Sequence, residues 1–384
     1  MKKALPKLKQ AQTGVVCFGE VLLALSTPQH QRFEQAQQLE LTYTGAEANT
    51  ALALARFGNR TRVVTRLPGH ALGQAAVNSL RRYGVDTEFM LRGGEKLGLL
   101  YLEVGLAQRP SQVLYDRKNS AFAELKPGMI SWKEVLSGYH WFHFSGTSPA
   151  FGSGVEACLQ EGLKVARHLG LGTSMDCNYR STLWDVKEAK KAFLRLVPGL
   201  DLFSGTSHDL KNFFDGQGSE EQAAAAFRKN FGVARVALTQ RQTDSQGVER
   251  FSGMLLGKDA VRRSQVHAVS PLGRIGSGDA FMAGLIHGAL AEWPEDRIIE
   301  FAAAAACLKQ TIANDLPIFS AAEIEEWVDE AKRGMENALR AKPLDIKEQY
   351  ERQLKELQEA YGEAMLEIRA RKKYQALLDK EDEK

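Results

Sequence analysis

The feature that most constrains the fold is a regular alternation of short apolar segments with helical ones. The apolar segments are rich in β-branched and aromatic residues, which is typical of buried strands, and the strongest of them, residues 15–25 (VVCFGEVLLAL), carries one acidic residue, Glu20. We predict strands at 15–25, 61–68, 139–146, 172–180, 200–205 and 234–240, and helices at 45–58, 73–84, 154–170, 189–197 and 220–232. This alternation predicts an α/β fold in which helices cover both faces of a mostly parallel sheet.

Two stretches, residues 21–43 and 87–118, interrupt the alternation. They contain segments such as LGLLYLEVG and SQVLYDR, which are typical of antiparallel strands. In open α/β folds ligands bind beyond the carboxyl ends of the parallel strands. We therefore expect these stretches to form a small separate sheet that acts as a lid over a ligand site.

The two ends of the chain differ from the middle. Residues 1–13 are basic and lack the apolar segment of a signal peptide, so we expect a disordered leader. After Pro343, apolar residues recur at steps of three and four within a strongly charged segment, which predicts a long amphipathic helix over 343–384. This helix would drive self-assembly, bind a partner protein or pack back on its own domain. The main domain is then expected to span 14–335.

The balance of charge and the cysteines exclude several classes of protein. The formal net charge is only +3, so neither nucleic acid nor an anionic membrane is an expected partner. The four cysteines are scattered without CxxC spacing, which favours a reducing, cytoplasmic setting over disulfides or zinc. No apolar run reaches the length of a transmembrane helix.

Residues 273–281, GRIGSGDAF, carry the clearest chemistry in the sequence. A glycine-rich loop here leads directly into an apolar helical run, so the backbone amides of Gly276, Ser277 and Gly278 can point into one concavity at a helix start. Such a site stabilises the negative charge of a phosphoryl group in transfer, and Asp279 is placed to accept a proton from a substrate hydroxyl. An ordinary helix cap is the alternative interpretation.

Two arginines at predicted strand ends suggest the charge of the substrate. Arg117 follows the lid segment and Arg180 follows the strand over 172–180; if both reach the cleft, two guanidinium groups suit a carboxylate better than a neutral sugar. Asp176 and Asn178 lie in the same segment and would order the substrate or a metal-bound water. Ion pairing for each arginine, and strand-end capping for Asp176 and Asn178, are the alternatives.

Several separated motifs together resemble the ribokinase-like (PfkB) carbohydrate kinases, and most closely the 2-keto-3-deoxygluconate kinases. The resemblance covers about residues 14–330 and rests on GRIGSGDAFMAG, FGEVLLAL, GAEANTALALARFG, TRLPGHALGQAAVNSLRRYGVDT, LGLLYLE, YDRKNSA, WFHFSG, DCNYRSTLW and AAAAACLKQTI. It implies a doubly wound sheet with a small β lid, and we expect copies of the chain to form a homo-oligomer through that lid. It also implies ATP with Mg²⁺ as phosphoryl donor, Asp279 as the catalytic base and the Gly276–Gly278 amides as an anion hole.

The resemblance further implies two sets of binding residues and assigns no metal ligand. The sugar-acid substrate would be bound by Gly45, Asn49, Tyr101, Tyr115, Arg117, Asp176, Asn178 and Arg180. The nucleotide would be bound by Thr206, Thr239, Arg241, Gly276, Gly278 and Asn314.

The sequence also departs from the family pattern at clustered positions. Gly273 stands where the family has an aspartate, Thr44 where it has a glycine, and Leu100 where it has a substrate-side tyrosine. His70, Lys96, Thr206, Gln310 and Asn314 are further departures. Two hypotheses follow: a kinase that phosphorylates a small keto sugar acid such as 2-keto-3-deoxygluconate, or a catalytically degenerate homologue that serves as a structural or interaction protein.

Overall fold

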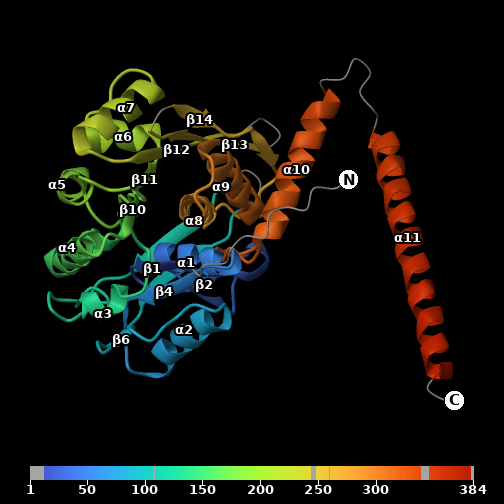
Figure 1. Cartoon of the computed structure of the whole chain (residues 1–384). Helices are drawn as coiled ribbons and strands as arrows, with labels where there is room; N and C mark the ends of the chain where they lie inside the picture. Colours follow the sequence, from blue (N-terminus) through green and yellow to red (C-terminus); the bar gives the residue numbers. More distant parts are fainter. Residues whose placement is uncertain (1–12, 107–108, 244–247, 259, 339–345, 382–384) are drawn as a thin grey trace. The chain divides into compact units, whose positions relative to one another are not determined.

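The computed structural model describes residues 13–106, 109–243, 248–258, 260–338 and 346–381 (Figure 1). The chain divides into two compact units, one ending at Val328 and one beginning at Asp329. The leader predicted over residues 1–13 lies outside the described residues except for Thr13.

The first unit is built on one large sheet. Six of its strands run parallel, in the order β4 (Arg60–Val64), β1 (Gly14–Phe18), β9 (Trp141–Ser145), β10 (Gly172–Asp176), β11 (Leu202–Gly205) and β12 (Arg235–Thr243). The antiparallel strand β13 (Glu249–Leu256) follows β12, and it pairs in turn with β14 (Val261–Arg263) and β15 (His267–Val269). The chain turns from β1 outward to β4 and later returns to β9 on the other side of β1, which opens a crevice at the carboxyl ends of these strands.

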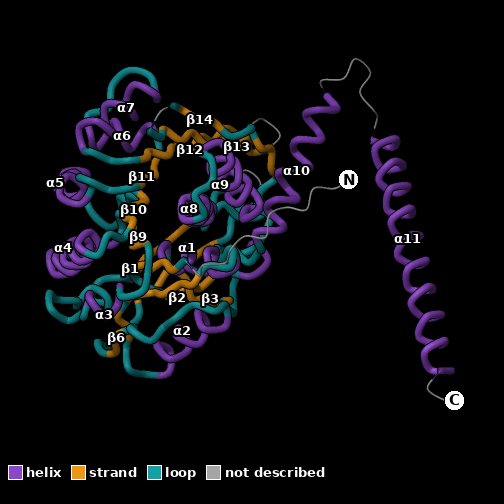
Figure 2. The backbone as a smooth tube through the Cα atoms, viewed as in Figure 1, coloured by secondary structure: helices purple, strands orange, loops and turns teal. Residues whose placement is uncertain are grey.

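Helices cover both faces of this sheet (Figure 2). Alternate residues of a strand point to opposite faces, and in β1 Val15 and Cys17 join one hydrophobic core cluster while Val16 and Phe18 join the other. One face packs against α1 (Ala46–Arg56), α2 (Ala71–Arg82), α8 (Ser277–Leu290), α9 (Glu295–Gln310) and the start of α10 (Ala321–Ala338). The other packs against α3 (Trp132–Leu136), α4 (Ser153–His168), α5 (Val186–Leu196), α6 (Ser207–Phe214) and α7 (Glu220–Phe231). The predicted α/β fold with a mostly parallel sheet is confirmed.

The segment 15–25 forms two strands rather than the single one predicted. Strand β1 ends at Phe18 in the large sheet, and β2 (Leu22–Ser26) begins a second sheet after three intervening residues. In this small sheet the order is β3 (Glu40–Thr44), β2, β7 (Gly98–Glu103) and β8 (Gln112–Asp116). The pair β2–β7 is parallel, unlike the antiparallel arrangement predicted, because the chain passes through the large sheet between the two strands.

A further difference concerns the start of the second lid stretch. Residues 91–92 form β6 (Leu91–Arg92), which pairs with β5 (Arg66–Leu67) and does not join the small sheet.

The small sheet is attached to the large unit along one of its edges. Leu22 pairs with Thr44 on one side and Gly98 on the other, and these residues are where β2, β3 and β7 meet the rest of the chain. Strand β8 leaves at the same edge, since Asp116 pairs with Leu99. The chain therefore enters and leaves the small sheet along the one edge that lies beside the crevice.

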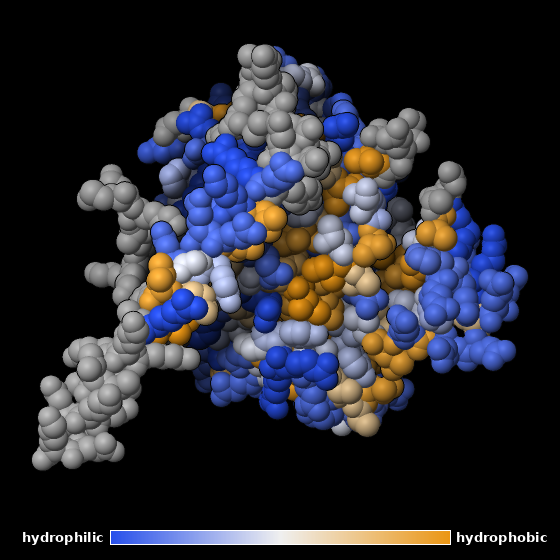
Figure 3. Space-filling model, turned by 90° about the vertical axis from the view of Figure 1, so that its right-hand side faces the viewer, coloured by the Kyte–Doolittle hydropathy of each residue, from blue (hydrophilic) through white to orange (hydrophobic). Residues whose placement is uncertain are grey.

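The two faces of the small sheet have different surroundings. Leu22, Ala24 and Leu100 form a buried cluster on one face. On the other face Leu41 and Leu114 are 60% and 58% exposed. Figure 3 shows that hydrophobic residues gather in patches between hydrophilic ones on the face of the molecule that it presents.

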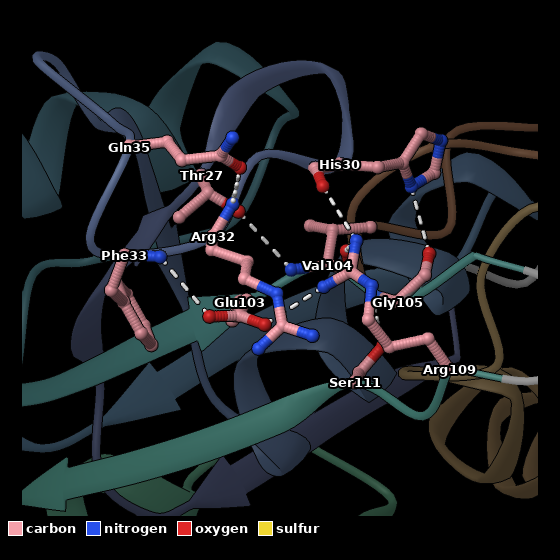
Figure 4. Close-up of polar contacts among 10 residues, drawn as sticks. All are labelled: Thr27, His30, Arg32, Phe33, Gln35, Glu103, Val104, Gly105, Arg109 and Ser111. Atoms are coloured by element: carbon pink, nitrogen blue, oxygen red, sulfur yellow. Dashed lines mark hydrogen bonds and ion pairs between the residues drawn. The ribbon is translucent and has the colours of Figure 1, made fainter.

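At the edge of the small sheet opposite its attachment, polar contacts tie two loops together (Figure 4). Arg109 donates to the buried Glu103 carboxylate at 2.8 Å and to the carbonyl of His30 at 2.5 Å. The Phe33 amide donates to the second oxygen of Glu103 at 3.0 Å. These bonds join the loop around the short 3₁₀ helix η1 (Pro28–His30) to the β7–β8 connection.

In the second unit, α11 (Ile346–Glu381) is a single helix of 36 residues that passes through Gly362 without a break. Within the described residues, no helix combines the length and apolar character needed to cross a lipid bilayer.

Candidate active site

A cavity of about 540 Å³ opens where the parallel strands end and the small sheet begins. It brings together most residues predicted for the site: Gly45, Asn49, Tyr115, Arg117, Asp176, Asn178, Arg180, Thr206, Thr239, Arg241, Gly276, Ser277, Gly278 and Asp279. Segments that are distant in the sequence thus meet at one place, as the topology of an open α/β sheet dictates.

Tyr101 and Asn314 are the two predicted residues that do not line the cavity. Tyr101 follows Leu100 in β7, and adjacent strand residues face opposite sides of a sheet. Leu100 lines the cavity opposite its cross-strand partner Tyr115, so Tyr101 belongs to the other face of the small sheet. Asn314 is exposed, and its backbone carbonyl accepts a hydrogen bond from Lys309 Nζ at 2.7 Å.

Helix α8 begins at the floor of the cavity, and glycine is required at its first position. Gly276 caps the helix in the left-handed conformation, with φ of +83°. A Cβ atom there would overlap the carbonyl oxygen of Asp315, so no other residue fits without moving the backbone. The amides of the first helical turn have no partner within the helix, and they lie where an anion can reach them.

Asp279 lies in the first turn of α8 and is 9% exposed. Its carboxylate accepts a hydrogen bond from Asn49 Nδ2 at 2.8 Å. Burial, aided by the negative charges of Asp176 and Asp315, raises the pKa of Asp279 to about 8, against the opposing influence of Asn49 and Arg180. A carboxyl group that titrates near this value is a stronger base than a free aspartate and can accept a proton from a hydroxyl group.

A second carboxyl group, Asp176, faces Asp279 from the end of β10. Burial raises its pKa to about 7, and the charge of Asp209 adds to the rise while Arg180 opposes it. If Gly278 carried a Cβ atom, that atom would lie 3.9 Å from Asp176 Oδ2. Asp176 therefore lies next to the start of α8. The cavity therefore holds two carboxyl groups that change charge near neutral pH.

The two predicted arginines differ in their surroundings. Arg117 is 9% exposed and its Nε pairs with the buried Glu20 carboxylate at 2.6 Å. Within the described chain its hydrogen bonds use Nε alone, which leaves the terminal amino groups for the cavity. Arg180 is exposed and makes no ion pair with the described residues. Its charge nevertheless lowers the pKa of both Asp176 and Asp279.

At the other side of the cavity, Thr206 caps helix α6. Its hydroxyl group accepts a hydrogen bond from the Asp209 amide, and Asp209 Oδ2 accepts one from the Thr206 amide at 2.8 Å, which is a reciprocal capping box. The nearby Arg241 donates from Nη2 to Ser277 Oγ at 2.5 Å. This contact places a guanidinium group beside the start of α8, where it adds positive charge near the loop amides.

Sequence reasoning missed three carboxyl groups: Glu47 and Asp315 line the cavity, and Glu20 lies next to the cavity-lining Arg117. Asp315 accepts a hydrogen bond from Thr44 Oγ1, and Glu47 accepts one from Ser148 Oγ at 2.8 Å. Glu20, noted only as an acidic residue in an apolar segment, is the partner of Arg117. Burial raises the pKa of all three. Glu47 lies inside the motif GAEANTALALARFG, where a charged residue in a mostly apolar segment was the available signal, whereas Asp315 lies three residues beyond the motif AAAAACLKQTI, which gave no signal for it.

Gly273, where the family pattern has an aspartate, lies beside a buried lysine. A Cβ atom on Gly273 would be 3.8 Å from the carbonyl oxygen of Asn314 and 3.9 Å from that of Ile312, which are ordinary contacts. The same two carbonyls accept hydrogen bonds from Lys309 Nζ, at 2.7 and 3.3 Å. Lys309 is fully buried, and this burial lowers the pKa of its ammonium group to about 8. A buried lysine thus stands next to the position of the missing carboxylate.

A family model identifies the family to which this fold belongs. The model for pfkB family carbohydrate kinases matches residues 12–315. The chain belongs to this family. Its members transfer phosphate to a sugar hydroxyl group, so the chain is a PfkB-type carbohydrate kinase close to the 2-dehydro-3-deoxy-sugar kinases.

Individual relatives agree with this family assignment. The 2-dehydro-3-deoxygluconokinase of Thermotoga maritima is 37% identical, with a TM-score of 0.79 over 83% of this chain and 99% of that one. A putative 2-keto-3-deoxygluconate kinase from Enterococcus faecalis is 26% identical, with a TM-score of 0.78 over 83% and 97%. The 2-dehydro-3-deoxygalactonokinase of Haloferax volcanii is 29% identical over 81% of this chain and 95% of its own length.

PfkB kinases use ATP with Mg²⁺, and a structure of the putative Ribokinase II of E. coli, 19% identical with a TM-score of 0.73, contains both. The described residues contain no cluster of three or more metal-ligating side chains. Mg²⁺ in kinases is bound largely by the phosphates with one or two carboxylates, and Asp176 beside the start of α8 fits that requirement. The loop Gly276–Gly278 at the start of α8, which lines the cavity, fits the phosphates.

Proposed function

We propose that the chain is an ATP-dependent kinase of a small keto sugar acid of the 2-keto-3-deoxygluconate type. The observation that supports it most is the position of Asp279, a buried carboxyl group of raised pKa at the start of a helix whose first amides face the same cavity. A base and an anion-binding loop at one place are what phosphoryl transfer to an alcohol requires.

In this proposal Asp279 accepts the proton of the substrate hydroxyl group. The hydroxyl oxygen forms a bond to the γ-phosphorus of ATP, and the bond from that phosphorus to the bridging oxygen breaks to release ADP. The amides of Gly276, Ser277 and Gly278 stabilise the charge on the transferring group, and Arg241 adds a positive charge beside them. Thr206 and Thr239 border the space left for the nucleotide.

The acidic substrate is inferred from Arg117 and Arg180. Arg180 brings a charge that the described residues leave without an ion pair, and Arg117 offers the amino groups that Glu20 does not use. A carboxylate between them would satisfy both guanidinium groups. Gly45 and Asn49, together with Tyr115, Asp176 and Asn178, would contact the remaining polar groups of the sugar acid.

We also propose that two copies associate through the face of the small sheet that points away from the cavity. Leu41 and Leu114 expose apolar surface on that face, which would become buried against a second copy.

Turnover decides between this proposal and a degenerate homologue. We expect ATP consumption with 2-keto-3-deoxygluconate or 2-keto-3-deoxygalactonate, and no consumption with Asp279→Ala. Arg180→Gln should raise KM for the acid more than for the corresponding neutral keto sugar, because only the acid loses an ion pair. An intact protein that binds ATP but turns over neither acid would refute the kinase proposal and favour the degenerate homologue.

A further inference from the structure

Lys309, in the last turn of α9, is a buried cation that the mechanism above does not use. Its side chain is fully buried, and Lys309 is not among the described residues that line the cavity. A buried charge is costly unless neighbouring groups satisfy it. The contacts of the ammonium group therefore show which part of the chain Lys309 stabilises.

The ammonium group is bonded to the turn that follows α9. Lys309 Nζ donates to the carbonyl oxygen of Asn314 at 2.7 Å and to that of Ile312 at 3.3 Å. Asn314 has a φ of +62°, in the left-handed region that is uncommon for residues with a side chain. The two hydrogen bonds therefore fix the direction of the chain at this turn, just before it reaches Asp315.

This turn lies directly against the glycine loop at the start of α8. The carbonyl oxygen of Asp315 is the atom that a Cβ on Gly276 would overlap, and Lys309 Cε would lie 3.2 Å from the same Cβ position. The Asp315 side chain is held in turn by a hydrogen bond from Thr44. The loop that begins with Gly276 thus packs on a surface that Lys309 and the carbonyl group of Asp315 form together.

The charge of Lys309 acts on the same place. The negative charges that favour its ammonium form are those of Asp315 and Asp279, and both of these residues line the cavity. Lys309 itself lies on the side of the loop that faces away from the cavity. A positive charge there adds to the effect of the loop amides, which stabilise negative charge on a phosphoryl group.

From these contacts we propose that Lys309 is a positioning residue for phosphoryl transfer. It fixes the turn 312–315, which supports the loop Gly276–Gly278, and it places a positive charge behind that loop. The inference rests on the proposed function, because it assigns Lys309 a part in that reaction. Since Lys309 does not line the cavity, its loss should lower kcat and weaken nucleotide binding while KM for the sugar acid stays nearly the same.

Lys309→Met tests this role, and Gln310→Met is the matched control. Gln310 is the next residue of α9 and is equally buried, but its side-chain amide has no hydrogen-bond partner among the described residues. Both variants therefore place methionine at a buried polar position at the end of α9, and only Lys309→Met removes the bonds to the turn. With ATP saturating, we expect kcat to fall about tenfold or more for Lys309→Met and less than about twofold for Gln310→Met. KM for 2-keto-3-deoxygluconate should stay within about twofold of the parent in both.

Binding of AMP-PNP, an ATP analogue whose γ-phosphate is not transferred, tests the loop without turnover. Isothermal titration calorimetry in the presence of Mg²⁺ should give a Kd about tenfold weaker for Lys309→Met and an unchanged Kd for Gln310→Met. A parent protein that binds AMP-PNP but phosphorylates neither acid would refute the proposed function. The comparison of Kd values would then decide the role of Lys309 by itself.

Equal effects of the two methionine variants, on kcat or on Kd, would overturn the role of Lys309, because they would trace the effect to packing at the end of α9. A parent that does not bind AMP-PNP would overturn both this role and the proposed function. Far-ultraviolet circular dichroism checks that the variants fold. If Lys309→Met does not fold, Lys309→Gln, which loses the charge but keeps a hydrogen-bond donor, is measured against the same limits.

Discussion

Replacing Gly276 with alanine should damage catalysis far more than the size of one methyl group suggests. The left-handed conformation costs a residue with a Cβ atom about 1–2 kcal/mol. In addition, the new methyl group would overlap the carbonyl oxygen of Asp315, well inside the 3.0 Å that real Cβ atoms respect. Relief of the overlap requires the loop to move by about 1 Å, and a displacement of that size at a reacting centre can lower the rate about 100-fold.

The matched control is Gly273→Ala in the same loop. A Cβ atom there meets nothing closer than 3.8 Å, and its φ is not in the left-handed region. Steady-state kinetics and thermal unfolding of both variants compare the two positions. We expect kcat to fall about 100-fold for Gly276→Ala and by less than about threefold for Gly273→Ala. A Gly276→Ala enzyme with kcat within threefold of the parent would refute the reasoning that this loop must keep its position.

Three further predictions concern charge and the small sheet. Asn49→Leu removes the hydrogen bond that favours the charged form of Asp279, so the acidic limb of the pH profile of kcat/KM should move up by about one to two units; an unmoved limb would exclude Asp279 as the titrating base. Asp279→Asn removes a carboxyl group whose pKa is raised on folding, and such a group costs stability as pH rises from its unfolded pKa toward about 8. The variant should therefore be more stable than the parent by roughly 1–3 kcal/mol at pH 8 and by less at pH 5, as measured by denaturant unfolding; a gain independent of pH would contradict this. Glu103→Gln should loosen the loops joined by Arg109, so that amides of residues 27–35 exchange with solvent several-fold faster while those of α8 do not; uniform exchange would show that the contact is not local.

The sequence was sufficient for the architecture because the alternation of strands and helices is a local property. It also located Asp279 and the loop before it, because a glycine at a helix start followed by a carboxylate is a short pattern. The placement of Arg180 at the cavity followed from the rule that parallel strands end on the same side of a sheet, and that of Arg117 from the expectation that the small sheet covers the site.

What the sequence did not reveal depends on contacts between distant segments. The hydrogen bond between Thr44 and Asp315 joins residues 271 positions apart, and no local sequence pattern near either residue predicts it. The point at which residues 15–25 divide into β1 and β2 depends on which sheet each half joins. The sequence does not mark this point, because both halves are equally apolar. Tyr101 was predicted to bind the substrate, yet it lies on the face of the small sheet opposite to Leu100, so the register of β7 and β8 was needed to assign it.

The attachment of the small sheet has a mechanical consequence. If the small sheet tilts about the edge by which it is attached, the displacement of its residues grows with their distance from that edge. The loops tied by Glu103 and Arg109 lie about 16 Å away, one five-residue strand length, and would travel farthest. The pair of Glu20 and Arg117 lies almost on the line itself, so it would turn very little. Such a lever could admit and release ligands at its free end while the guanidinium group at its base keeps nearly the same place throughout the cycle.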